Sequence, residues 1–216
     1  MTALDELFER YPTLLGQGAS IVSARALLVD SATSGHTVYV CGNGGSAADA
    51  EHIVGELMKG MVRRRPLSRD ERHALAAAAP ASRSEDAAML AEGLDRAVRA
   101  VCLSSQSSLL TAVANDLGPH LGFAQQVFGY GAAGDVLWAI STSGRSRNVV
   151  LAALAARARR MPVFALTGHD GGDLAPLATV CVAVPATDVS SVQELHRPVY
   201  HALCRELEDE VFPPAR

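Results

Sequence analysis

Hydrophobic residues follow two patterns along the chain. Short runs in which almost every residue is apolar occur at residues 135–140, 161–166 and 179–184, at 37–41, and more weakly at 98–103. Continuous rather than alternating runs are typical of parallel strands covered on both faces of a sheet. Between these runs, most clearly over 148–159, apolar residues recur at helical spacing. The alternation predicts a doubly wound α/β fold.

The two ends of the chain carry longer amphipathic patterns. Residues 3–34 are expected to be helical, with Pro12 dividing or bending the region, because proline lacks an amide hydrogen. Their apolar stripes indicate packing or a dimer contact rather than chemistry. Residues 190–211 predict a C-terminal helix. Pro198 lies inside that pattern and predicts either a kink or the true boundary of the helix.

Residues 63–97 interrupt the alternation of strands and helices. A run of three arginines and Pro66 leads into a stretch rich in Ala, Arg, Asp and Glu. We expect a flexible loop over 76–84 and a helix over 86–99. One interpretation is a solvated excursion from the fold. The other is a functional segment, either a lid or the wall of a partner's active site.

Composition narrows the class of protein. The formal net charge of −4 gives no general attraction to nucleic acid. No run approaches the roughly 18 apolar residues of a membrane span, and the acidic N-terminus is unlike a signal peptide. The four cysteines are far apart, without a Cys-x-x-Cys pattern, and are expected to be reduced core residues. We therefore expect one cytoplasmic domain with no membrane or nucleic-acid partner.

Two turns that follow predicted strands have the composition of a phosphate site. Gly42-Asn43-Gly44-Gly45-Ser46 joins the first strand to a helical pattern, and backbone N–H groups at a helix N-terminus bind anions. Ser141-Thr142-Ser143-Gly144-Arg145-Ser146 follows a later strand and offers hydroxyl groups. In doubly wound folds, ligands bind beyond the carboxyl ends of the strands. The two turns together predict one phosphate-binding site.

A nucleotide cofactor is the weaker interpretation of the glycine-rich turn. No Gly-Lys-Ser/Thr follows the glycines, so the turn is not a Walker P-loop. Gly42-x-Gly44-x-x-Ala47 fits the dinucleotide fingerprint loosely. The strand that should end in an acidic residue about 20 positions later is not evident. We expect no nucleotide cofactor.

Reactive side chains follow the glycine-rich turn. His52 and Glu56 stand four residues apart and share one face of the predicted helix. Alone, they are an ordinary helical ion pair worth about 0.3–0.5 kcal/mol. Gln193 and His201, eight residues apart on the C-terminal helix, would join them if that helix docks over the same turns. The set would then suit zinc, with the amide oxygen as an unusual ligand.

Several motifs occur in a characteristic order. They are Asn43-Gly44-Gly45-Ser46, His52-x-x-x-Glu56, Asn115-Asp116, Ser141-Thr142-Ser143-Gly144-x-Ser146, Leu166-Thr167-Gly168 and Gln193-Glu194-x-His196-x-x-x-x-His201. Together they resemble the phosphoheptose isomerase group of sugar isomerase (SIS) domains. The resemblance covers nearly the whole chain except roughly residues 66–98.

The resemblance implies an architecture. A single SIS domain would span residues 1–216, with N-terminal helices over 1–35 and an atypical insertion around 66–98. The family fold is a five-stranded parallel doubly wound sheet flanked by helices, a flavodoxin-like three-layer αβα sandwich. Its members assemble as homotetramers with sites between subunits.

The resemblance also implies a reaction, the conversion of sedoheptulose 7-phosphate to D-glycero-D-manno-heptose 7-phosphate through an enediolate. Glu56 and His201 would be the catalytic pair. One zinc ion per site would be held by His52, Glu56, Gln193 and His201. The residues assigned to the phosphosugar are Asn43, Gly44, Gly45, Ser46, Asn115, Asp116, Ser141, Thr142, Ser143, Ser146 and Gln193.

The chain departs from the family pattern near its C-terminal helix. Ser190 stands where the family usually has an aspartate that contacts substrate, and Asp188 is the nearest carboxylate. Pro198 lies between Gln193 and His201. These departures affect the identity of the sugar phosphate that is the substrate more than the class of reaction. The alternative function is a non-catalytic SIS-type protein that binds phosphosugars or a replication initiator. The presence of Glu56 and His201 favours the enzyme.

Overall fold

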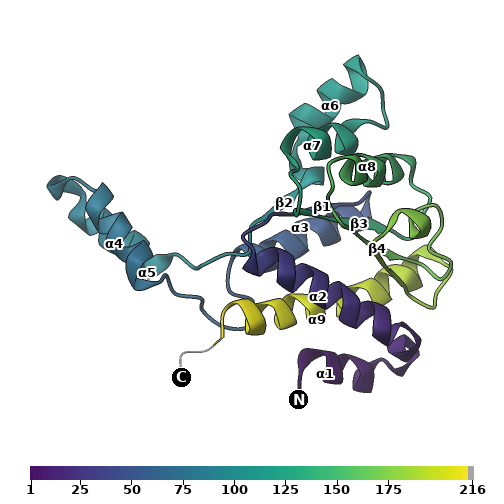
Figure 1. Ribbon diagram of the computed structural model, residues 1–216, viewed down its shortest axis with the longest axis horizontal. Coiled ribbons are helices and arrows are strands. Elements are labelled where there is room, and N and C mark those ends of the chain that lie inside the picture. The colour runs from purple at the N-terminus through teal and green to yellow at the C-terminus, as the bar shows by residue number, and fades with distance from the viewer. Residues whose placement is uncertain (214–216) are drawn as a thin grey trace.

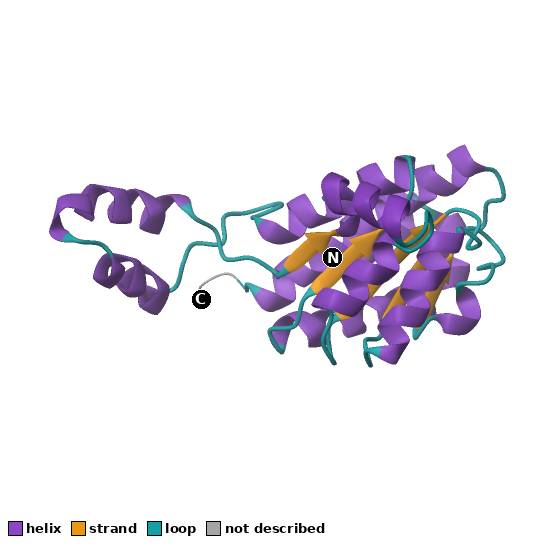
Figure 2. Cartoon of the chain, turned by 90° about the horizontal axis from the view of Figure 1, so that it is seen from above, coloured by secondary structure: helices purple, strands orange, loops and turns teal. Residues whose placement is uncertain are grey.

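The computed structural model describes residues 1–213, which contain one parallel sheet between two layers of helices (Figures 1 and 2). The sheet order is β2-β1-β3-β4-β5, and all four neighbouring pairs are parallel. The predicted five-stranded doubly wound fold is confirmed. The strands are β1 Val38–Cys41, β2 Ala100–Cys102, β3 Val136–Ser141, β4 Val163–Thr167 and β5 Val180–Ala183.

Helices cover both faces of the sheet. The α-helices are α1 Ala3–Arg10, α2 Gly18–Thr33, α3 Gly45–Met58, α4 Arg69–Ala78, α5 Ser84–Gly93, α6 Ser107–Asp116, α7 Gly122–Tyr130, α8 Arg147–Ala158 and α9 Val189–Val211. Val38 and Val40 face a core shared with α1, α2, α3 and α9. Tyr39 and Cys41 face the opposite core, with α7 and α8. Successive strand residues point to opposite faces, so burial on both faces explains the continuous apolar runs.

The two prolines of the terminal regions have different effects. α1 ends at Arg10, and Pro12 opens a 3₁₀ turn, Pro12–Gln17, that leads into α2. The predicted division of the N-terminal region is confirmed. By contrast, α9 continues through Pro198, so a helix boundary at that residue is wrong. Its buried stripe, which includes Val199 and Leu203, outweighs the one hydrogen bond that proline cannot make.

Residues 66–98 form a helical hairpin that projects from the sandwich (Figure 2). The flexible loop predicted over 76–84 is wrong at both ends, because α4 continues to Ala78 and α5 begins at Ser84. The helix predicted over 86–99 is also wrong beyond Gly93, since the following residues extend toward β2. Ser68 and Glu71 form a capping box at the start of α4. That Ser-x-x-Glu spacing was the overlooked signal in the sequence.

The strand order places the phosphate turns side by side. β1 pairs with β2 on one side and with β3 on the other, so the chain connections diverge from β1. Ligands of doubly wound sheets bind at such a switch point, outside the carboxyl ends of the strands. The turns over residues 42–46 and 141–146 follow β1 and β3 at this point. Within residues 1–213, no helix is both long and apolar enough to cross a membrane.

Candidate active site

The turns after β1 and β3 enclose a hollow of about 300 Å³. Most of the residues predicted to bind phosphate line it, and Gln193 reaches it from α9. The lining residues are Asn43, Gly44, Gly45, Ser46, Ile140, Ser141, Thr142, Ser146, Val189 and Gln193. The structure therefore brings two distant turns and the C-terminal helix to one place.

Glycine is required where the first turn tightens. A Cβ at Gly42 would lie 2.6 Å from the carbonyl oxygen of Ser46, and Gly44 has a φ of 54°. This geometry starts α3 directly after β1. Among the described residues, α3 and α8 receive no side-chain hydrogen bond from their N-cap residues, Gly44 and Ser146, although Asn148 Oδ1 accepts the Val149 N–H at 3.1 Å. Their first amides, together with the helix dipoles, are suited to an anion in the hollow.

Side-chain hydrogen bonds link the first turn to α8 and brace the second turn internally. Asn43 and Asn148 exchange amide hydrogen bonds of 2.8 Å in both directions, which ties the first turn to α8. The Ser141 hydroxyl donates to the Ser146 hydroxyl at 3.0 Å. Ser143 differs from these residues, because its hydroxyl accepts the Arg145 N–H at 3.1 Å and does not line the hollow. The site is thus largely preorganised by its own contacts.

The proposed acid–base residues meet where α3 packs against α9. His52 Nε2 lies 3.2 Å from Glu56 Oε1, and the rings of His52 and His201 have centroids 5.0 Å apart. Glu56 is 17% exposed at its side chain. Burial lowers the pKa of His201, and the neighbouring His52 acts in the same direction. His201 is therefore neutral near pH 7 and able to accept a proton.

The four residues predicted as metal ligands are not equally close. Gln193 packs against Gly45 at the phosphate turn. It lies about 12 Å along α9 from His201, given eight residues at 1.5 Å each. Within the described part of the chain, no three His, Cys, Asp or Glu side chains form a ready group for a metal ion. The donor types of His52, Glu56 and His201 do suit zinc.

Other predicted residues lie outside the hollow. Asn115 and Asp116 are exposed at the end of α6, where Asn115 Nδ2 donates to Asp116 Oδ1 at 2.7 Å. Asp188 caps α9 by accepting the Ser191 N–H at 3.0 Å. Ser190 lines a second hollow, which Gln193 also borders. The Asp188 carboxylate is thus engaged in helix capping.

The structure adds residues that sequence reasoning did not single out. The Tyr200 hydroxyl donates to Asp49 Oδ1 at 3.1 Å, and the Tyr200 ring contacts His201 edge-on. Burial raises the pKa of Asp49, and burial beside Asp49 raises the pKa of Tyr200 to about 12. Arg197 lines the surface between the phosphate turn and His201. Its place four residues from both Gln193 and His201 was a usable signal.

Known proteins are similar to this chain in sequence and in architecture. A family model described as SIS domain matches residues 6–112 and 95–168. A phosphoheptose isomerase from Akkermansia muciniphila is 33% identical over 94% of this chain and 92% of its own. One from Thiobacillus denitrificans is 39% identical over 82% of this chain and 77% of its own.

A solved structure gives the same result. The phosphoheptose isomerase GmhA from Neisseria gonorrhoeae aligns with a TM-score of 0.73 and 32% identity, over 95% of this chain and 94% of that one. With relatives 33–39% identical over most of the chain and a solved structure of the same architecture, the chain belongs to the phosphoheptose isomerase family of SIS-domain proteins.

Proposed function

We propose that the chain is an aldose–ketose isomerase that converts sedoheptulose 7-phosphate to D-glycero-D-manno-heptose 7-phosphate. The observation that carries the proposal is the position of the Glu56–His201 cluster on the same helix pair, α3 and α9, that borders the phosphate hollow. The phosphoheptose isomerases similar to this chain support the choice of substrate.

The hollow provides the binding part of this function. The N-terminal ends of α3 and α8 and the hydroxyls of Ser46, Ser141 and Thr142 surround a space suited to a phosphate dianion. Holding the phosphate at one end directs the carbonyl end of the sugar along α9. Hydrogen bonds to a charged group contribute about 1.5–3 kcal/mol each.

The cluster of α3 and α9 provides the chemistry. The Glu56 carboxylate removes a proton from C1 of the ketose. His201, which is neutral near pH 7 because its pKa is lowered, accepts the proton of the C1 hydroxyl and passes it to the C2 oxygen, giving an enediolate with its negative charge on the C1 oxygen. Glu56 then returns its proton to C2, and the C1 oxygen becomes the carbonyl of the aldose. No atom is lost or gained in the interconversion.

Zinc is the metal that we propose for this site. His52, Glu56 and His201 would hold it. Family resemblance assigns Gln193 as the fourth donor, and its side chain would have to turn away from Gly45 to reach the ion. A bound zinc ion would stabilise negative charge on the substrate oxygens. Because a zinc-bound carboxylate is a weaker base, Glu56 cannot serve fully as ligand and base at once. Metal content and activity measured together after chelation test this role. Full activity in metal-free protein would exclude an essential zinc ion.

A homotetramer with sites between subunits is also proposed, in the cytoplasm. Asn115 and Asp116 support it, since family resemblance assigns them to substrate while their own chain leaves them exposed and outside the hollow. Exposed Phe128 and Tyr130 on α7 offer apolar surface for a contact. Light scattering of the purified protein measures the mass of the assembly. A monomer that is fully active would contradict shared sites.

The decisive experiment is proton exchange in deuterated water with sedoheptulose 7-phosphate. An isomerase incorporates deuterium at C1 or C2 of the sugar and forms the aldose, which NMR detects directly. A folded protein that binds the phosphosugar without any exchange would overturn the isomerase assignment. It would favour the non-catalytic binding protein instead.

A further inference from the structure

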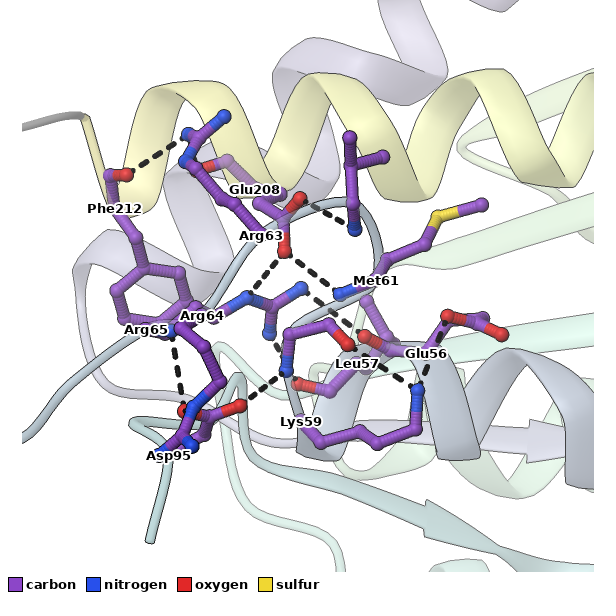
Figure 3. A network of polar contacts seen from close by, with 12 residues as sticks. Glu56, Leu57, Lys59, Met61, Arg63, Arg64, Arg65, Asp95, Glu208 and Phe212 are labelled. Atoms are coloured by element: carbon purple, nitrogen blue, oxygen red, sulfur yellow. Dashed lines mark hydrogen bonds and ion pairs between the residues drawn. The ribbon is translucent and has the colours of Figure 1, made fainter. Parts of the chain in front are cut away.

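After α3 the chain turns back and places Arg65 against the last turn of that helix (Figure 3). The Arg65 side chain is 1% exposed. Its guanidinium donates to the carbonyl oxygens of Leu57 at 2.9 Å and of Glu56 at 3.1 Å. The last four carbonyls of a helix have no partner within the helix. Arg65 therefore bonds to two of the carbonyls that α3 leaves open. The Leu57 carbonyl also accepts the Val98 N–H at 2.9 Å, and the other carbonyl belongs to Glu56 itself.

Arg65 is itself fixed from α9. Its Nε donates to Glu208 Oε1 at 2.8 Å, and the Glu208 side chain is also 1% exposed. Glu208 accepts two more hydrogen bonds, from the amides of Met61 at 2.8 Å and Val62 at 3.0 Å. Burial acts to raise the pKa of Glu208, but these donors and Arg65 outweigh it, so the pKa is lowered. The carboxylate stays ionised and holds the guanidinium in place.

We propose that Arg65, held by Glu208, is a positioning residue that sets the place of Glu56 by anchoring the last turn of α3. The proposal rests on the proposed function, in which Glu56 is the base. A planar guanidinium can serve three acceptors in fixed directions, whereas a lysine ammonium cannot reproduce that fork. Displacing a catalytic group by about 1 Å costs roughly 100-fold in rate.

The neighbouring arginine supplies a matched control. Arg64 Nε donates to Asp95 Oδ1 at 2.7 Å, and Arg64 Nη2 donates to the carbonyl of Glu92 at 3.0 Å. These bonds close the stem of the α4–α5 hairpin and involve no residue of α3, and the Arg64 side chain is 61% exposed. Asp95 also accepts the Gly60 N–H at 3.0 Å and the Arg65 N–H at 3.2 Å, and neither of these bonds needs the Arg64 side chain. Replacing Arg64 thus removes an arginine ion pair one residue away from Arg65 and leaves the end of α3 intact.

The test compares Arg65→Lys, Arg65→Met and Arg64→Met with the wild-type chain, using sedoheptulose 7-phosphate. In Arg65→Lys, kcat is expected to fall roughly 10–100-fold while KM changes less than about 3-fold, because the phosphate turns are untouched. The kcat of Arg65→Met is expected to be lower still, so kcat should decrease in the order wild type, Arg65→Lys, Arg65→Met. Arg64→Met should stay within about 2-fold of wild type.

Hydrogen–deuterium exchange provides a readout that does not depend on activity. Arg65→Lys should speed exchange over residues 55–59 by about 10-fold or more and leave β3 unchanged. Unchanged exchange there, or faster exchange with an unaltered kcat, would overturn the proposal. Equal losses of kcat in Arg65→Lys and Arg64→Met would do the same. If Arg65→Met does not fold, Arg65→Lys and Glu208→Gln carry the comparison. Lack of turnover by the wild-type chain would count against the proposed function, while exchange over 55–59 still decides the anchoring.

Discussion

The phosphate hollow and the acid–base cluster are built in different ways. The hollow consists mainly of backbone and short side chains from two strand–turn–helix units, each local in sequence. The cluster consists of long side chains from α3 and α9, which are nearly 150 residues apart, as in the Tyr200–His52 contact. Binding of the phosphate and proton transfer are thus separable. Mutations in the hollow should act on KM, and mutations in the cluster should act on kcat.

The largest expected effect is at Glu56. Glu56→Gln preserves the size of the side chain and removes the base, so kcat should fall by roughly 10³-fold or more, while KM stays within a few-fold. Steady-state kinetics and deuterium incorporation measure both. A variant that remains fully active would show that another group is the base.

The helix shared by the two regions gives a second prediction. His196 on α9 is fully buried, and its two ring nitrogens have no hydrogen-bond partner among the described residues. Burial lowers the pKa of His196 from 6.5 to about 4. Between these values the unfolded state binds more protons than the folded state, so stability falls as the pH drops from 6.5 toward 4. The loss is about 3 kcal/mol in all.

His196→Leu should remove this part of the pH dependence, since leucine does not titrate. Denaturant unfolding between pH 7.5 and 4.5 would then show a flatter decline of the free energy of unfolding than in the wild-type chain. Parallel curves for the two proteins would mean that His196 is not responsible for the acid sensitivity.

A smaller effect is expected in the hollow. Ser46 is buried and lines it, so Ser46→Ala should raise KM about 10-fold through the loss of one hydrogen bond to phosphate, with kcat nearly unchanged. Inhibition of Ser46→Ala by inorganic phosphate should weaken in parallel, with a similar increase in its inhibition constant. A fall in kcat with unaltered KM would show that the two regions are not separable in this way.

The smallest effect is expected at Ser143, and it sharpens the same distinction. The sequence motif assigns Ser143 to the phosphate, yet the structure engages its hydroxyl with the Arg145 amide, outside the hollow. Ser143→Ala should therefore leave KM within about 2-fold of wild type. An increase as large as that of Ser46→Ala would restore Ser143 to the binding residues.

The pattern of hydrophobic and polar residues determined most of the fold, and also the parts of the site that are formed by residues close together in the sequence. Continuous apolar runs predicted the strands, because both faces of this sheet are covered. The turn at Gly42 and the helical spacing of His52 and Glu56 are local features, so their geometry could be derived from neighbouring residues. The α4 helix was missed even though its capping box at Ser68 is local.

Only the tertiary structure decided which distant groups meet. The packing of α9 against α3 sets His201 beside His52, directs Gln193 to Gly45 instead, and buries Arg65 with Glu208. Spacing along one helix fixes which face a side chain shares, but not which other helix that face contacts. That contact depends on how the layers bury their apolar surface together. The free energy of this packing is the sum of many small interactions between residues far apart in the sequence, so no single motif predicts it.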